Sequence, residues 1–178
     1  MSMKKIAAFA GSTSSTSINK QLATYAAQQL ENVAFDVLDL NAYKVPIFSE
    51  DVERENDYPE GAQLFNDDLD KYDGFIVSLA EHNGSYAAAF KNLFDWTSRK
   101  NREVFRNKPV LLMATSPGGR GGAGVLSTAN GTFPHMGAKI VSNFSLPVFY
   151  DNFKEGEIVA EDKKNELKEA VATFEQAL

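Results

Sequence analysis

The sequence predicts a doubly wound α/β fold built on a five-stranded parallel sheet. Apolar runs of strand length alternate with stretches of helical periodicity along the 178 residues. Runs such as 4–10, 74–79 and 110–115 are nearly continuous in apolar residues, as expected of parallel strands buried on both faces. We expect one domain over residues 1–178, because this length supports a single core and the chain contains no linker-like tract.

The first half of the chain alternates apolar and amphipathic segments. A strand over 4–10 leads to a helix over 19–30, for which Ser17 is the expected N-cap. The apolar residues of this helix recur at helical spacing: Ile18, Leu22, Tyr25, Ala26 and Leu30. A second strand follows over 33–40, and the Pro-containing acidic stretch 41–57 is expected to be a loop.

The remaining elements continue the same alternation. Pro59 suits the first turn of a helix that ends near residue 71, and a third strand spans 73–80. Aromatic and aliphatic residues on one face then predict a helix over 86–99. The last four expected elements are a strand over 109–116, a helix over 123–136, a strand over 139–144 and an amphipathic helix over 162–178.

Three polar loops follow the first, third and fourth strands, and the strand order decides whether they meet. Right-handed crossovers leave few possible orders. We favour the order 2-1-3-4-5, which sets these three loops side by side at the carboxyl edge of the sheet, where ligands bind in such folds. The loops are residues 11–19, 80–86 and 116–124, and their backbone N–H and hydroxyl groups suggest a phosphorylated cofactor.

The composition excludes several classes of function. A net charge of −6 argues against a nucleic acid or an anionic membrane as the main partner. The absence of cysteine excludes disulfides, thiolate catalysis and cysteine-based metal sites, and two histidines without paired spacing predict no metal site. No apolar run reaches the ~20 residues of a membrane span, and no signal peptide is recognisable, so we expect a cytoplasmic protein.

The first loop has the chemistry of an anion site. Its run of serines and threonines lies before an expected helix, whose N-terminus offers free N–H groups and a partial positive charge. It is not a nucleotide-triphosphate P-loop, because that motif requires a lysine that is missing here. The alternative is a solvated capping region without a ligand.

His82 and Asn83 stand out in the second loop. A serine hydrolase would need a Gly-x-Ser-x-Gly elbow, which the sequence lacks, so we expect His82 to contact a ligand or stabilise the loop rather than act as a base. The backbone N–H groups of Asn83 and Gly84 could face the edge of a planar heterocycle.

The third loop matches a dinucleotide fingerprint in the wrong context. Residues 119–124 read Gly-Arg-Gly-Gly-Ala-Gly, but they follow the fourth strand and no acidic residue lies about 20 positions downstream. We interpret this segment as a backbone loop that approaches a flat ring closely. Arg120 is its one charge, available to a second anionic ligand or a partner subunit.

Together the three loops resemble the NADPH-dependent FMN reductase family. The first reads Gly-Ser-Thr-Ser-Ser-Thr-Ser-Ile-Asn-Lys-Gln-Leu over residues 11–22, and the second reads Ala-Glu-His-Asn-Gly-Ser-Tyr over 80–86 and continues to Asp95-Trp96. The third is the Ser-Pro-Gly-Gly-Arg-Gly-Gly turn over 116–122. The resemblance spans essentially the whole chain and implies a flavodoxin-like fold. Ser14 stands where the family has an arginine, and His82 where it has a tyrosine.

The resemblance implies a set of cofactor-binding residues. The phosphate of FMN would lie against the first loop, and the isoalloxazine ring and ribityl chain against the other two. No residue is expected to be catalytic. The residues expected to bind the cofactor are Ser12, Ser14, Ser17, Ile18, Asn19, Glu81, His82, Asn83, Gly84, Ser116, Pro117, Gly118 and Gly119.

The activity implied is that of an FMN-dependent NAD(P)H oxidoreductase. Hydride would pass from NAD(P)H to flavin N5 and then to a small acceptor such as a quinone, an azo compound, free flavin or an oxidised metal species. Two alternatives stay open, namely an FMN electron carrier without nicotinamide activity and a flavin-free interaction module. Phe94 and Trp96 lie on different faces of the helix over 86–99, which either means that Trp96 caps the core or, with the resemblance, implies a homodimer or homotetramer.

Overall fold

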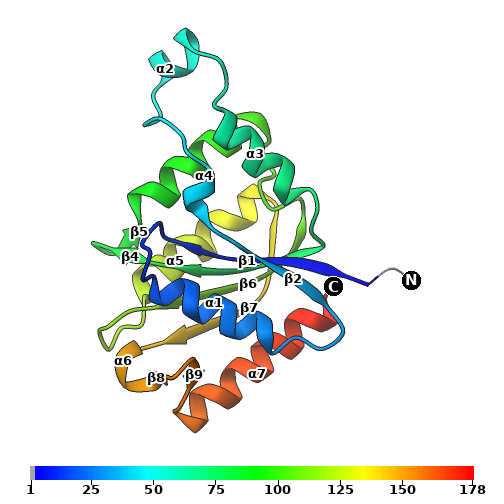
Figure 1. Cartoon of the computed structure of the whole chain (residues 1–178), viewed down its shortest axis with the longest axis vertical. Coiled ribbons are helices and arrows are strands. Elements are labelled where there is room, and N and C mark those ends of the chain that lie inside the picture. Colours follow the sequence, from blue (N-terminus) through cyan, green and yellow to red (C-terminus); the bar gives the residue numbers. More distant parts are fainter. Residues whose placement is uncertain (1–2) are drawn as a thin grey trace.

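The computed structural model describes residues 3–178 and is built on five parallel strands (Figure 1). Their order across the sheet is β2-β1-β3-β6-β7, so the predicted order 2-1-3-4-5 is confirmed. Every neighbouring pair is parallel. The strands are β1 (Lys5–Gly11), β2 (Ala34–Leu38), β3 (Gly74–Leu79), β6 (Lys108–Thr115) and β7 (Ala138–Leu146).

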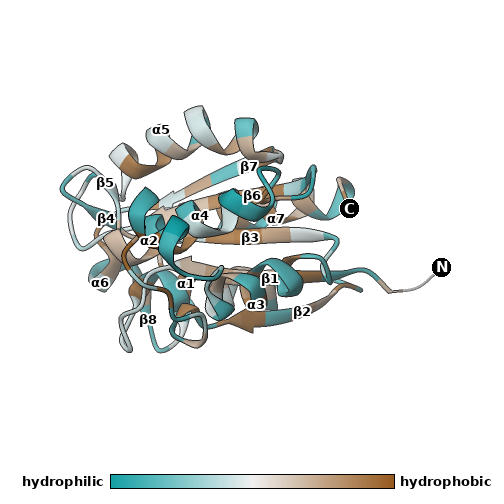
Figure 2. Cartoon of the chain, turned by 90° about the horizontal axis from the view of Figure 1, so that it is seen from above, coloured by the Kyte–Doolittle hydropathy of each residue, from teal (hydrophilic) through white to brown (hydrophobic). Residues whose placement is uncertain are grey.

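Helices cover both faces of this sheet. Helices α1 (Ile18–Gln28) and α7 (Glu161–Gln176) pack on one face. The other face carries α3 (Glu60–Leu69), α4 (Ala88–Lys100) and α5 (Ala123–Thr132). Successive residues of a strand point to opposite faces of the sheet. In β1, Ile6 and Ala8 therefore pack in the core beneath α1 and α7, whereas Ala7 and Phe9 pack in the core beneath α3, α4 and α5. Figure 2 shows the resulting apolar strands between the helical layers.

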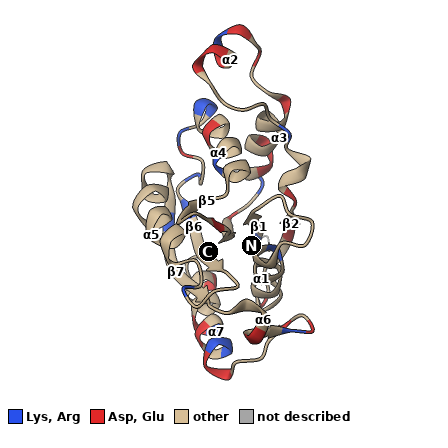
Figure 3. Ribbon diagram, turned by 90° about the vertical axis from the view of Figure 1, so that its left-hand side faces the viewer, with Lys and Arg blue, Asp and Glu red and all other residues tan. Residues whose placement is uncertain are grey.

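The acidic stretch between β2 and α3 is not the loop that we expected over 41–57. It contains a short 3-10 helix, η1 (Leu40–Ala42), and an exposed acidic helix, α2 (Glu50–Glu55), which projects from the body (Figure 3). The hydroxyl of Ser49 caps α2 by accepting from the N–H of Val52 at 3.1 Å. No residue of α2 is buried. The sequence therefore lacks apolar residues at helical spacing in this segment, which is the pattern by which a helix is predicted.

The helix expected over 86–99 begins two residues later, because a small hairpin precedes it. Strands β4 (Glu81–His82) and β5 (Ser85–Tyr86) pair in antiparallel fashion. Asn83 and Gly84 form the two-residue turn with φ of 52° and 80°. Both turn positions need positive φ, for which Asn-Gly is the preferred dipeptide. The dipeptide was therefore a hairpin signal, and Tyr86 belongs to the hairpin rather than to the helix.

The helix expected over 123–136 is interrupted. Helix α5 ends at Thr132 and a 3-10 turn, η2 (Phe133–Met136), follows it, with Pro134 in its first positions. Proline cannot donate its backbone hydrogen bond and clashes with the preceding turn, which ends the α-helix. After β7 the chain forms α6 (Phe149–Asn152) and a second small hairpin of β8 (Phe153–Lys154) and β9 (Glu157–Ile158).

Phe94 and Trp96 are both buried within one chain, so they offer no apolar surface to a partner subunit. The side chains of Phe94 and Trp96 are 5% and 0% exposed. The indole N–H of Trp96 donates to the carbonyl of Pro46 at 2.8 Å, and the ring of Phe48 packs edge-on against it at 5.0 Å. The segment before α2 therefore covers this face of α4, and of the two alternatives for Trp96 the structure supports the one in which it belongs to the core. None of the helices described combines the length and apolar character of a membrane span.

Replacing Phe48 should uncover the single tryptophan of the chain. We expect Phe48→Ala to shift the Trp96 emission to longer wavelength, because the indole loses its edge-on neighbour. We also expect a loss of about 1–2 kcal/mol in the free energy of unfolding, less than for a fully buried phenylalanine. Emission spectra and urea unfolding test both effects. The control is Ile47→Ala, since that neighbour is 79% exposed; equal shifts in the two variants would contradict this packing.

Candidate functional site

The carboxyl ends of β1, β3 and β6 open onto a hollow of about 250 Å³. All three loops that the sequence singled out contribute to its wall, because the strand order makes them neighbours. The predicted cofactor-binding residues in the wall are Ser12, Ser14, Ser17, Ile18, Asn19, Glu81, His82, Ser116 and Pro117.

Four of the expected residues lie outside this wall. Asn83 and Gly84 form the exposed turn of the β4–β5 hairpin. Gly118 and Gly119 lie in the third loop, where a side chain at either position would meet no atom within 4 Å. The space beside these two glycines is therefore open, and their contact with a cofactor stays a prediction.

Asn19 ties the first loop to the neighbouring strands through buried hydrogen bonds. Its amide nitrogen donates to the carbonyl of Thr115 at 3.1 Å. Its amide oxygen accepts from the N–H of Thr115 at 3.0 Å and from the hydroxyl of Ser78 at 2.8 Å. The residue is 2% exposed, so the side chain positions the loop and leaves the backbone N–H for a ligand. From the sequence we expected Asn19 to contact the cofactor. The direction of its side chain depends on Ser78 and Thr115, which are distant in the sequence, so the sequence does not reveal it.

The first loop presents hydroxyls and N–H groups at the start of α1. The hydroxyl of Ser17 caps the helix by accepting from the N–H of Lys20 at 3.1 Å, as predicted. Ser12 and Ser14 accept from backbone N–H groups within the loop at 3.2 and 3.4 Å. The hydroxyls of Ser12 and Ser17 still have their protons to donate, and so does that of Ser14 when Thr16 is the donor in the 3.4 Å contact between their hydroxyls. No lysine or arginine of residues 3–178 lines the hollow, so an anion there would be held by dipoles alone.

Glu81 links the second loop to the third. Its carboxylate accepts from the N–H of Val125 in the first turn of α5 at 2.8 Å. A side chain on Gly124 would approach that carboxylate to 2.8 Å and the carbonyl of Gly84 to 3.0 Å. The last glycine of the fingerprint-like segment is therefore required by close packing of the hairpin on α5 rather than by a dinucleotide.

Four residues of the wall were missed by the sequence analysis: Thr16, Ala80, Thr115 and Tyr150. Tyr150 is the most prominent, since its side chain is 64% exposed at the rim of the hollow. It comes from α6, where we had expected no element. The aromatic pair Phe149-Tyr150 directly after the fifth strand was the available signal, because this strand ends at the same edge of the sheet.

A strained backbone holds Tyr150 in place. Val148 has φ of 47° and ψ of 56°, a left-handed conformation that is rare for a β-branched residue and costs of order 1–3 kcal/mol. Its N–H donates to the carbonyl of Gly118 at 3.1 Å, and the N–H of Phe149 donates to the carbonyl of Ser116 at 3.1 Å. The buried ring of Phe149 packs edge-on against Tyr150 at 5.6 Å. The third loop and α6 thus form one wall.

Comparison with known proteins identifies the family. A sequence model described as NADPH-dependent FMN reductase matches residues 4–174. The chain belongs to this family. The family resemblance of the three loops is therefore confirmed, as are the FMN cofactor, the NAD(P)H co-substrate and oxidoreductase activity as such.

Curated relatives agree with this family placement, and a solved structure agrees with the fold. The chain is 30% identical over 169 residues to 2-hydroxy-1,4-benzoquinone reductase from a Burkholderia species, a match that covers 92% of this chain and 90% of the relative. It is 30% identical to quinone reductase from Escherichia coli over 101 residues, 54% of each chain. Its fold superposes with a TM-score of 0.78 on the flavoenzyme NAD(P)H:(acceptor) oxidoreductase FerB from Paracoccus denitrificans, at 24% identity, covering 98% of this chain and 96% of the other.

Removing the amide of Asn19 should destabilise the protein strongly. We expect Asn19→Ala to lower the free energy of unfolding by about 3 kcal/mol, because the N–H and carbonyl of Thr115 and the hydroxyl of Ser78 lose their partners in a buried site. Urea unfolding measures the loss. The matched control is Asn130→Ala on α5, an exposed asparagine whose replacement should cost under about 0.5 kcal/mol. Similar losses in both variants would contradict the role of Asn19.

Proposed function

We propose that the hollow at the carboxyl edge binds FMN and that the reductase uses it to reduce quinones. The observation that carries this proposal is the meeting of all three predicted loops around one hollow. Its donor set suits a phosphate and a sugar-like chain, because it consists of hydroxyls, backbone N–H groups and a helix N-terminus.

The first loop would hold the phosphate. The hydroxyls of Ser12, Ser14 and Ser17 would donate to the phosphate oxygens, together with the backbone N–H groups of Ile18 and Asn19 at the start of α1. Because the described residues bring no lysine or arginine to the wall, these neutral donors would provide the direct stabilisation. Asn19 would contribute indirectly as well, because its side chain fixes the loop.

The second and third loops would hold the ring system. Glu81 and His82 would line one side, and Ser116 and Pro117 the other, while the open space at Gly118 and Gly119 leaves room for a planar group. When bound, FMN supplies the redox chemistry, taking hydride from NAD(P)H and delivering it to an acceptor. The N–H groups of Asn83 and Gly84 would stabilise negative charge that develops on the ring edge. No side chain is assigned as a catalytic acid or base.

A quinone is the acceptor that we favour. The relative that aligns over 92% of this chain is named a 2-hydroxy-1,4-benzoquinone reductase. The rim of the hollow carries the exposed side chains of His82, Pro117 and Tyr150, and the aromatic rings of His82 and Tyr150 suit a flat aromatic molecule. Azo compounds, free flavin and oxidised metal species are the competing acceptors.

The oligomeric state and the cellular location stay predictions. If the protein forms a homodimer or homotetramer, the face of α4 with Phe94 and Trp96 is not available for the contact, because both side chains are buried. An apolar hollow of about 550 Å³ between the segment 40–47 and the start of α4 is the surface that we propose instead. Ile47 lines it and is 79% exposed. Sedimentation of the protein with and without FMN would establish the assembly.

Spectroscopy tests the function directly. The purified protein, reconstituted with FMN, should show flavin absorbance that bleaches on anaerobic addition of NADH or NADPH and returns on addition of a benzoquinone. Flavin that binds but is not reduced would indicate an electron carrier. Protein that FMN cannot reconstitute would overturn the proposal and favour a flavin-free module.

Negative charge at the helix cap should repel the phosphate. We expect Ser17→Asp to raise the Kd for FMN about 10- to 100-fold, equivalent to about 1.4–2.7 kcal/mol. Aspartate is itself a good N-cap, so the helix should persist. Riboflavin lacks the phosphate and should bind both proteins equally. Ser17→Ala separates loss of the cap from added charge, and an FMN affinity equal to wild type in Ser17→Asp would refute the phosphate assignment.

Tyr150 should contribute to acceptor binding through its ring. We expect Tyr150→Ala to raise the KM for a benzoquinone about two- to tenfold, the range of one aromatic contact, while Tyr150→Phe keeps the wild-type value. Steady-state kinetics with saturating NADPH measures this. If Tyr150→Phe were impaired as much as Tyr150→Ala, the hydroxyl rather than the ring would be the important group.

A further inference from the structure

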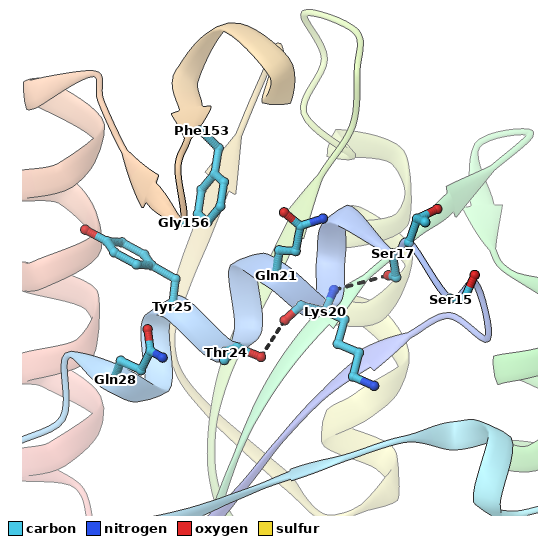
Figure 4. A pocket seen from close by; sticks show the side chains of 10 residues that line it. Ser15, Ser17, Lys20, Gln21, Thr24, Tyr25, Gln28, Phe153 and Gly156 are labelled. Carbon is cyan, nitrogen blue, oxygen red and sulfur yellow. Dashed lines mark hydrogen bonds between the residues drawn. The ribbon is translucent and has the colours of Figure 1, made fainter.

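A cation lies close to the first loop without entering the candidate FMN site. Lys20 is the third residue of α1, and its side chain lies in a groove of about 370 Å³ along the outer face of that helix (Figure 4). Thr16 and Ser17 line both this groove and the hollow. Lys20 therefore lies on the other side of loop residues that border the proposed phosphate position.

An ion pair directs the ammonium of Lys20 away from the site. This ammonium lies 2.6 Å from the carboxylate of Asp39, the residue that follows β2. Figure 4 shows the side chain of Lys20 pointing away from Ser15 and Ser17. A paired lysine and aspartate have no net charge, so a bound phosphate gains little from Lys20 while the pair persists.

The carboxylate of Asp39 is itself held in place beside the first loop. Its other oxygen accepts from the backbone N–H of Asn41 at 2.9 Å and from the side-chain amide of Asn41 at 2.8 Å. The same amide nitrogen donates to the carbonyl of Thr13 in the first loop at 3.1 Å. The ammonium of Lys20 and the two bonds from Asn41 lower the pKa of Asp39 to about 2. Asp39 is therefore ionised at neutral pH and presents a fixed negative charge to Lys20.

Without this ion pair, the side chain of Lys20 can extend to the start of α1. Side chains on a helix point back toward its N-terminus, and a residue at the third helical position reaches the N-cap in the capping box. The N-cap of α1 is Ser17, whose hydroxyl we assign to the phosphate. Because lysine is longer than the glutamate of a capping box, its ammonium can pass beyond the cap.

We propose that Asp39 sets the affinity for FMN by holding Lys20 away from the phosphate. The proposal rests on the proposed function in one respect, namely that the first loop holds the phosphate of FMN. In the wild-type protein neutral donors then hold this phosphate, and bound FMN exchanges readily with free flavin. Removing the carboxylate of Asp39 frees a cation for a phosphate monoester that carries about −1.5 to −2 charge at pH 7.

Titration of the protein with FMN and with riboflavin tests this role of Asp39. We expect Asp39→Asn to lower the Kd for FMN about five- to tenfold and to leave the Kd for riboflavin unchanged, because riboflavin lacks the phosphate. Asparagine can also accept from the N–H of Asn41, so the turn after β2 should persist. The ion pair is exposed and contributes little to stability, so the variant should fold as the wild type does.

A second substitution assigns the gain in affinity to Lys20. In a double variant with Asp39→Asn and Lys20→Gln, the Kd for FMN should return close to the wild-type value, because the freed cation has been removed. The gain in Asp39→Asn should also shrink as salt rises from about 0.1 M to about 1 M, since salt screens exposed charges. The matched control is Asp162→Asn, which removes the same charge from an exposed position in the first turn of α7 and should leave both affinities unchanged.

Two results would contradict this role of Asp39. One is an FMN affinity of Asp39→Asn equal to that of the wild type. The other is a gain that the double variant retains in full, since loss of the negative charge alone would then explain it. Both results require that the wild-type protein binds FMN, so they leave the proposed function standing. A wild-type protein that binds no FMN would instead refute the proposed function.

Discussion

The buried amide of Asn19 sets the distance between the first loop and the ends of β3 and β6, and the candidate site depends on that distance. Its oxygen and nitrogen bond both backbone groups of Thr115, and the oxygen also bonds Ser78. The amide thereby completes hydrogen bonding at the point where the strands end and regular pairing stops. Because Asn19 lies in the first turn of α1, the same bonds also orient the helix N-terminus toward the hollow.

The parts of this molecule that the sequence predicts well are those with a local physical signal. Nearly continuous apolar runs identified β1, β3 and β6, and the cap at Ser17 identified the start of α1. The three loops followed from the strand order, since parallel strands end at one edge. Elements without an apolar period, such as α2, left no such signal, and the turn at Asn83-Gly84 was read for its ligand chemistry before its turn chemistry.

The remaining features depend on contacts that no local pattern contains. Trp96 was judged by its helical face alone, whereas the segment from Pro46 to Phe48 returns to cover it. Asn19 carried the right residue type for a ligand contact, but its side chain turns inward to Thr115. Tyr150 reaches the hollow because Val148 adopts a left-handed conformation. In each case a tertiary contact decides the direction of a side chain, so only the structure shows it.

The contact of Gly124 with the β4–β5 hairpin has a consequence for how the site tolerates change. Any side chain at this position would collide with the carboxylate of Glu81 and the backbone of Gly84, and shortening Glu81 would relieve only the first collision. The first turn of α5 therefore fixes the position of the second loop through close packing. Substitutions on this helix, although remote from a bound ring, can displace the backbone that faces it, and the two segments are constrained to vary together.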